Sequence, residues 1–177
     1  MKKSDPTKKI VSAAPFAALT FIATLIHIHF PGMVTGYVNI GDTMVISSAI
    51  LLGPVYGAGA AAVGSALTDL FHGYVIYVPG TFVIKFIMAI AAYFVFRLLS
   101  GKHKEIRVIP VTVAGVVSEL VMIVGYFLYE GLFIVGFPAA SVGIYGNCVQ
   151  GGFSIVLSVI LLKFLGKTKV AKSILNQ

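Results

Sequence analysis

The sequence has no tryptophan, a single cysteine and few charged residues. The lone Cys148 excludes an internal disulfide and a cysteine-rich metal cluster. Charged residues make up 11% of the 177 residues, whereas a soluble domain carries about a quarter. The chain also lacks the G-x-S-x-G, H-E-x-x-H and P-loop patterns. Nothing therefore predicts catalytic residues, a bound cofactor or ATP hydrolysis by this chain itself.

Apolar residues dominate what is present. They account for 58% of the chain, and the mean hydropathy is +1.00. This composition argues against a water-soluble globule and against disorder. One crossing of a bilayer takes about 20 helical residues, so the length leaves room for about six crossings. The sequence therefore predicts an all-α integral membrane bundle of six transmembrane helices, forming a single domain over residues 1–177.

Glycine and proline divide the chain into these helices. Pro31-Gly32 and Gly53-Pro54 are expected to end the first and second helices. The second segment is too short to span a bilayer, so we expect it to tilt or to lie against a water-filled cavity. The expected helices cover residues 10–30, 43–53, 55–71, 81–99, 108–129 and 140–165.

Basic residues predict how the bundle is oriented. The formal net charge is +7, and 12 of the 13 lysines and arginines lie near the two termini or between the fourth and fifth helices. The positive-inside rule then places the N-terminus and the C-terminus in the cytoplasm. These residues flank helix ends and do not form a patch with aromatic residues, so no nucleic-acid partner is expected. They are Lys2, Lys3, Lys8, Lys9, Arg97, Lys102, Lys104, Arg107, Lys163, Lys167, Lys169 and Lys172.

Apart from Asp5 and Glu105, which belong to the cytoplasmic face, the other charged residues are expected within helices or on the outer side. Lys85 lies inside the fourth helix, and four carboxylates accompany it: Asp42, Asp69, Glu119 and Glu130. A charge inside a membrane is costly, so it normally faces a partner or a wet cavity. Two interpretations remain open. Lys85 forms a structural pair with Asp69 or Glu119, or several of these groups line a polar cavity that opens to the outside.

Polar and aromatic residues gather at the same level. Asn147, Gln150, Ser154 and Ser158 share one face of the sixth helix. Amides there could bind a neutral heteroaromatic ligand or hydrogen-bond between helices. Six of the eight tyrosines are also expected near the outer end, either around a flat ring or as interfacial anchors. They are Tyr37, Tyr74, Tyr77, Tyr126, Tyr129 and Tyr145. His27, His29 and His72 are expected to be interfacial and not to form a metal site.

Small residues on the first helix indicate a helix-packing face. Ala13 and Ala17 are four residues apart, and so are Ala14 and Ala18. Such faces allow close helix approach in a membrane. They serve either internal packing or docking to another membrane subunit.

These features together resemble the substrate-binding (S) component of energy-coupling factor (ECF) vitamin transporters. The resemblance rests on the alanine face and on an ordered set of segments: YVNIGD (37–42), LLGP (51–54), GSALTD (64–69) and YVPGT (77–81) ahead of Ile84-Lys85. It implies a multi-pass protein of a prokaryotic plasma membrane, in contact with lipid, that captures a vitamin from outside. It also implies a transmembrane coupling subunit and two ATPase subunits as partners, which use the ATP. The alanines Ala13, Ala14, Ala17 and Ala18 would dock to the coupling subunit.

The resemblance also guides the choice of ligand and site. The chain looks most like members assigned to hydroxymethylpyrimidine or pyridoxine, with riboflavin members as the alternative. The absence of tryptophan departs from thiamin-binding members. We expect Tyr37 and Asn39 to cover the ligand, Lys85 and Glu119 to anchor it, and the other residues to contact its ring or its polar groups. The expected substrate-binding residues are Tyr37, Asn39, Asp42, Tyr77, Lys85, Glu119, Tyr126, Tyr145, Asn147 and Gln150.

Two other functions remain open. The chain could be a self-sufficient ion-coupled carrier that uses Lys85, Asp69 and Glu119 as a proton relay. It could also be a structural membrane subunit whose buried charges only hold helices together.

Overall fold

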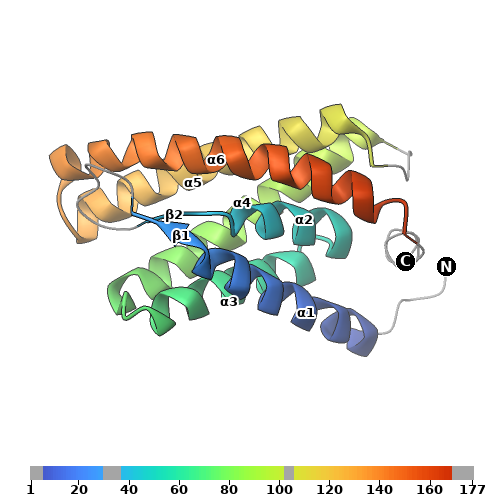
Figure 1. Cartoon of the computed structure of the whole chain (residues 1–177), viewed down its shortest axis with the longest axis horizontal. Helices are drawn as coiled ribbons and strands as arrows, with labels where there is room; N and C mark the ends of the chain where they lie inside the picture. Colours follow the sequence, from blue (N-terminus) through green and yellow to red (C-terminus); the bar gives the residue numbers. More distant parts are fainter. Residues whose placement is uncertain (1–5, 30–36, 102–105, 169–177) are drawn as a thin grey trace.

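The computed structural model describes residues 6–29, 37–101 and 106–168, and these residues form a helical bundle with one small hairpin (Figure 1). The hairpin consists of two short antiparallel strands, in which His27 pairs with Asn39 and Ile28 with Val38. The elements are α1 (Pro6–Leu25), β1 (His27–Ile28), β2 (Val38–Asn39), α2 (Asp42–Leu52), α3 (Tyr56–Phe71), the 3-10 turn η1 (Val75–Tyr77), α4 (Val78–Ser100), α5 (Val108–Phe133) and α6 (Phe137–Leu165).

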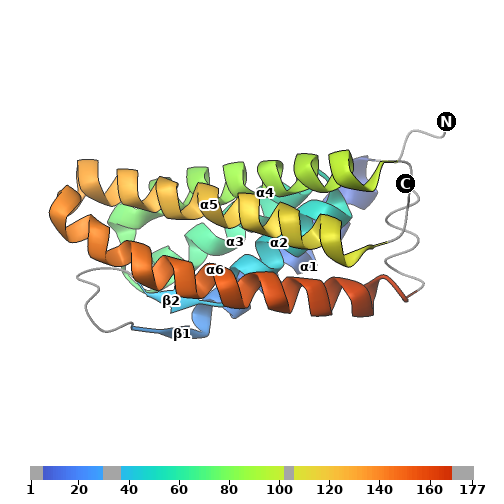
Figure 2. The ribbon, with the colours of Figure 1, turned by 90° about the horizontal axis from the view of Figure 1, so that it is seen from above.

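The short helix α2 lies in the middle of the bundle (Figures 1 and 2). It contacts all five other helices, and every residue from Asp42 to Leu51 is buried. A helix without an exposed polar face is typical of a fully enclosed position. The sequence predicted a helix too short to span a bilayer, and the structure shows that the other helices surround it.

Within the part of the chain that the structure describes, three elements are long and apolar enough to cross a membrane by length and composition. They are η1 with α4 (Val75–Ser100), α5 and α6, while the apolar parts of α1 and α2 are shorter. Large apolar side chains such as Leu98, Ile109 and Phe164 are at least 70% exposed. A surface of this kind is typical of a protein embedded in lipid, and the structure is consistent with a multi-pass membrane protein.

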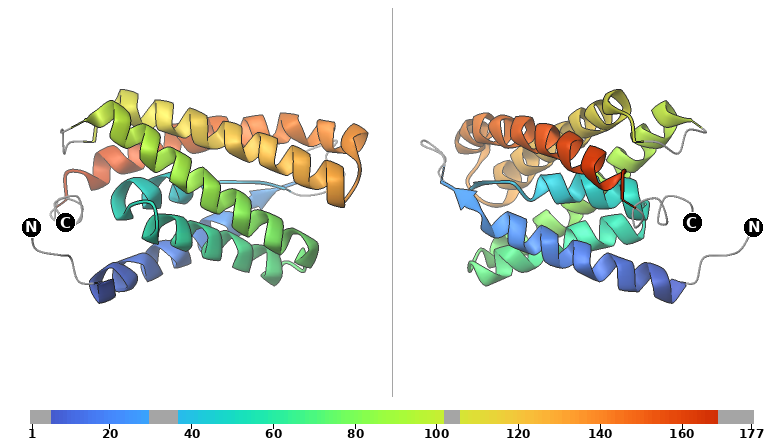
Figure 3. Two further views of the ribbon diagram at one scale, coloured as in Figure 1. Left: turned by 180° about the vertical axis from the view of Figure 1, so that it is seen from behind. Right: turned by 45° about the vertical axis from the view of Figure 1, so that its right-hand side comes forward.

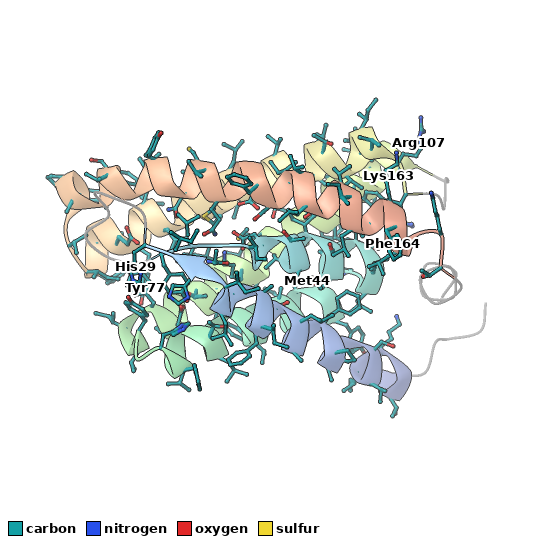
Figure 4. The ribbon with its side chains drawn as sticks, viewed as in Figure 1. His29, Met44, Tyr77, Arg107, Lys163 and Phe164 are labelled. Atoms are coloured by element: carbon teal, nitrogen blue, oxygen red, sulfur yellow. The ribbon has the colours of Figure 1, made fainter. Side chains whose placement is uncertain are left out.

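Basic side chains gather at one end of the bundle. The start of α1 and the end of α6 lie at this end, which we call the terminal end (Figures 1 and 3). The opposite end carries the β1–β2 hairpin and the α5–α6 turn. We call it the pocket end, because a polar pocket opens there. Figure 4 shows Arg107 and Lys163 near the terminal end, and His29 and Tyr77 at the pocket end. Lys2, Lys3, Lys102, Lys104, Lys169 and Lys172 lie outside the described residues.

Several helix boundaries differ from the sequence expectation. The first helix ends at Leu25 and not near residue 30, because residues 27–28 leave the helix to pair with β2. The alternation of Ile26, His27, Ile28, His29 and Phe30 has the period of a strand, but it is too short to stand out at the end of a long apolar segment. Helices α4 and α6 begin earlier than expected because Pro79 and Pro138 occupy their first turns, where no backbone N–H donor is needed. Helix α5 extends one turn further, to Phe133.

Candidate substrate pocket

A polar pocket opens at the pocket end of this apolar bundle. Its empty volume is about 480 Å³, including the part open to solvent. Side chains from α1, α3, α4, α5, α6 and the hairpin line it: Thr24, Tyr37, Asn39, Ser65, Asp69, Tyr74, Tyr77, Thr81, Lys85, Tyr126, Glu130, Asn147 and Gln150.

Lys85 forms a buried ion pair with Asp42 at the base of the pocket. The ammonium Nζ of Lys85 donates to Oδ1 of Asp42, and the two residues are 2% and 0% exposed. The predicted pairing of Lys85 with Asp69 or Glu119 was wrong. Asp42 is the correct partner because α2 is enclosed between the other helices and its first turn meets α4 there. Helix order along the chain does not reveal this neighbour.

Gln150 connects this ion pair to the hairpin. Its Nε2 donates to Oδ2 of Asp42 at 2.5 Å. Its Oε1 accepts from the backbone N–H of Asn39 at 2.8 Å and from Nδ2 of Asn39 at 3.2 Å. Gln150 lies on the predicted polar face of α6, and all four residues of that face are buried: Asn147, Gln150, Ser154 and Ser158.

Asn147 differs from Gln150 in having an unused amide. It lines the pocket one turn nearer the pocket end and is 7% exposed. Its backbone is bonded within α6, but its side-chain amide makes no hydrogen bond with another described residue. Because the pocket opens to solvent, this amide can bond to a polar group that enters the pocket. Asn147 is therefore a good candidate for a direct ligand contact.

Tyrosines and carboxylates form the pocket walls. The Tyr37 hydroxyl donates to Oδ1 of Asp69 at 2.8 Å, and the Tyr77 hydroxyl donates to Oε1 of Glu130 at 3.1 Å. Burial, together with the negative charge of Asp69, raises the pKa of Tyr37 above its ordinary value. Tyr126 lies beneath Lys85, with the ammonium 5.4 Å from the ring centroid. This pairing holds the cation over an aromatic face.

Seven of the ten predicted substrate-binding residues line this pocket, and three do not. Asp42 lies behind Lys85. Glu119 is 3% exposed, and neither carboxyl oxygen has a hydrogen-bond partner within the described part of the chain. Tyr145 is 67% exposed on the outside of α6 and is not part of the pocket. The seven are Tyr37, Asn39, Tyr77, Lys85, Tyr126, Asn147 and Gln150.

Six lining residues were not among the predicted site residues. Asp69 and Glu130 were noticed as carboxylates at the outer level, and Tyr74 as an outer tyrosine, so each carried a partial signal. The three small hydroxyl residues gave no signal, because serine and threonine are common in membrane helices as packing residues. The six are Thr24, Ser65, Asp69, Tyr74, Thr81 and Glu130.

The alanine faces of α1 point in two directions. Ala14 and Ala18 are exposed, whereas Ala13 and Ala17 are partly covered. The carbonyl of Ala17 lies against Gly64 of α3, so this side of α1 serves internal packing. The exposed pair is the side that another subunit could reach.

The histidines gather beside the hairpin. The rings of His27 and His72 are 4.6 Å apart, and those of His27 and His29 are 5.5 Å apart. Within the described residues, no group of three or more histidine, cysteine or carboxylate side chains could hold a metal ion.

Comparison with known proteins identifies the family. Residues 4–167 match the family described as "ECF-type riboflavin transporter, S component". The chain belongs to this family. As an ECF S component it is the substrate-binding subunit of a transporter, and S components are generally not enzymes. Family membership implies association with an ECF module of a membrane component and ATPases.

Two similar proteins accompany this match. A protein of Pyrococcus woesei, described as "Uncharacterized protein in gap 3'region", is 33% identical over 153 residues, which cover 84% of this chain and 97% of the relative. A solved structure described as "Structure and mechanism of the S component of a bacterial ECF transporter" matches with a TM-score of 0.64 at 16% identity. That match covers 91% of this chain and 96% of the other, and it shows that the two share the S-component fold.

Proposed function

We propose that this S component captures a flat, uncharged heterocyclic vitamin from the outside of the cell, with riboflavin as the first candidate. The observation that carries the proposal is the unused amide of Asn147 in a pocket that also holds the Lys85 ammonium. An amide both donates and accepts, so it can pair with the adjacent carbonyl and N–H groups of a flavin or pyrimidine ring. The ammonium supplies a donor for a second carbonyl or a hydroxyl group. The description of the matching family supports riboflavin.

Hydroxymethylpyrimidine or pyridoxine is the second candidate. The lining of the pocket supports this candidate, because it is rich in hydroxyl, amide and carboxylate groups that can pair with a hydroxylated ring. Walls of tyrosines with Asp69 and Glu130 would supply acceptors for the hydroxyl groups of such a ligand.

A ligand panel tests the proposal. The purified protein is mixed with riboflavin, hydroxymethylpyrimidine, pyridoxine or thiamin, and its melting temperature is measured. A ligand at about 100 times its dissociation constant adds about 2.7 kcal/mol of stability and gives a clear shift. Asn147→Leu should weaken binding about tenfold to a hundredfold without lowering the melting temperature of the ligand-free protein. No shift with any compound, together with no vitamin among co-purified small molecules, would refute the proposal.

We also propose the membrane arrangement and the partners. Six crossings with both termini in the cytoplasm would place the pocket at the outer face of a prokaryotic plasma membrane. The exposed Ala14 and Ala18 would dock to the coupling subunit of the ECF module, and its two ATPases would use ATP. The small side chains support this role because they permit close helix contact.

Uptake measurements separate this arrangement from an ion-coupled carrier. Ala18→Trp should block uptake by vesicles that contain the coupling subunit and the ATPases, while ligand binding to the isolated chain is kept. Ile109→Trp is the matched control, because Ile109 is 72% exposed on α5, away from this face. Uptake by the chain alone without ATP would support the ion-coupled alternative.

A further inference from the structure

We propose that Asp42 and Gln150 are positioning residues that mechanically couple the β1–β2 hairpin to the Lys85 ammonium, so that the hairpin and the ligand anchor are held or released together. The proposal deepens the proposed function, because Lys85 is the cation that a ligand would contact. The coupling itself is a property of the ligand-free protein. It can therefore be tested even if no vitamin binds.

The connection is continuous from the hairpin to the pocket. Two donors of Asn39 in β2 bond to Oε1 of Gln150, at 2.8 and 3.2 Å. Nε2 of the same Gln150 amide bonds to Oδ2 of Asp42 at 2.5 Å. The other oxygen of Asp42, Oδ1, accepts from Lys85. Three side-chain links thus join β2, α6, α2 and α4.

Burial makes these links strong. Asp42 is 0% exposed, Lys85 and Gln150 are each 2% exposed, and Asn39 is 9% exposed. Water cannot readily replace a bond that is broken here, so a displaced group is left unpaired. An uncompensated buried charge is especially costly. Partial loosening is therefore unfavourable, and the links should form or break together.

The polarity of every link is fixed. Oε1 of Gln150 faces only donors, those of Asn39, while Nε2 of Gln150 faces a carboxylate oxygen. Asp42 faces only donors, one on α4 and one on α6. If the amide of Gln150 were turned over, its nitrogen would face the donors of Asn39 and its oxygen would face the carboxylate of Asp42. A change of one link should therefore be transmitted to the next.

Because the donor and the acceptor of each hydrogen bond are fixed, the coupling can be tested by exchanging the carboxylate of Asp42 and the amide of Gln150. Asp42→Asn places an amide nitrogen against either Gln150 or Lys85, both of which are donors. Gln150→Glu places a carboxylate against the carboxylate of Asp42. In the double variant Asp42→Asn with Gln150→Glu, the new Asn donates to the new Glu and accepts from Lys85. The new Glu still accepts from Asn39, so all three links and the net charge are restored.

A spin label on the hairpin reports the coupling. Ile28 is 71% exposed in β1 and pairs with Val38, next to Asn39. A label at Ile28→Cys in a Cys148→Ser background gives the mobility of the hairpin by electron paramagnetic resonance. In the ligand-free protein we expect higher mobility in each single variant and the original mobility in the double variant. Unchanged mobility in both single variants, or no recovery in the double variant, would overturn the proposal.

Two further measurements keep the test decisive. Gln150→Leu removes both bonds to Asn39 and keeps the Lys85–Asp42 ion pair, so it should raise the mobility of the label even if Asp42→Asn does not fold. Ser118→Ala removes a buried hydroxyl that bonds to the carbonyl of Met88 and to no member of this network, and the label should not respond to it. If a vitamin binds, each single variant should raise its dissociation constant about tenfold to a hundredfold, mainly through faster dissociation, and the double variant should recover most of the affinity.

Discussion

Lys85 provides the only basic side chain buried in the described part of the bundle, and it balances Asp42. We predict that Lys85→Met lowers the free energy of unfolding by about 3–5 kcal/mol, because it leaves Asp42 charged and enclosed. Methionine keeps the apolar stem and removes the charge. The loss can be measured as a fall in melting temperature and denaturant midpoint in a single detergent.

A double variant separates the charge effect from packing. Lys85→Met combined with Asp42→Leu removes both charges and should recover much of the lost stability. It should not recover ligand binding, since the pocket cation is absent. A double variant that is no more stable than Lys85→Met would contradict the view that the stranded Asp42 charge causes the loss.

Tyr37 gives the protein a specific alkaline sensitivity. Its hydroxyl donates to Asp69, and burial with that carboxylate raises the pKa of Tyr37 above its ordinary value. The folded protein thus keeps the phenol proton when the unfolded chain loses it, so this contribution to stability is present below about pH 10 and is lost as the pH rises further. We predict that the wild type is more stable than Tyr37→Phe at about pH 8, and that the difference narrows toward about pH 11. Parallel melting curves over that range would contradict this assignment.

At the scale of elements, the crossing of α1 and α3 depends on one glycine. A Cβ atom on Gly64 would meet the carbonyl oxygen of Ala17, Cβ of Thr20 at 2.8 Å and the amide nitrogen of Phe21 at 3.2 Å. Because two of these atoms belong to the backbone of α1, the helices would have to separate. We predict that Gly64→Ala lowers the free energy of unfolding by about 1–3 kcal/mol.

Gly59 is the matched control in the same helix. A Cβ atom there meets nothing within 4 Å, so Gly59→Ala removes backbone freedom without a clash. We expect it to raise the free energy of unfolding by about 0.5–1 kcal/mol. Equal effects at the two positions, measured by thermal unfolding, would show that helix propensity and not the close crossing decides the outcome.

The helices and strands also show which features of the fold can be predicted from local sequence signals. Proline, glycine and apolar runs correctly predicted six helices and a short second one, because each of these signals is local. The strand at His27–Ile28 was missed, because it forms only when β2 lies beside it. The expected fourth and sixth helices began only at residues 81 and 140, after Pro79 and Pro138, whereas these prolines lie in the first turns of α4 and α6.

At the scale of the whole molecule, some site residues follow from a local sequence pattern, whereas others depend on how the helices pack together. The polar face of α6 followed from helical spacing, and its four residues are buried on one side. The pairing of Lys85 with Asp42 depends on α2 being enclosed, which is a property of the assembled bundle. Tyr145 lay at the right level along the chain but on the wrong side of its helix. The level of a residue along the bundle could therefore be predicted from the sequence. The side of the helix on which its side chain lies required the packed structure.

The basic residues and the pocket lie at opposite ends of the bundle, and this arrangement predicts how the protein is oriented in the membrane. Arg97, Arg107 and Lys163 lie at helix ends on the terminal side, and the pocket opens at the other end. Under the positive-inside rule, the terminal end faces the cytoplasm and the pocket faces outward. Cysteines at Ile28 and Lys167, each introduced alone in a Cys148→Ser background, mark the two ends. In intact cells a membrane-impermeant maleimide should label Ile28→Cys but label Lys167→Cys only after the membrane is permeabilised. The reverse pattern would place the pocket in the cytoplasm and would exclude capture from outside.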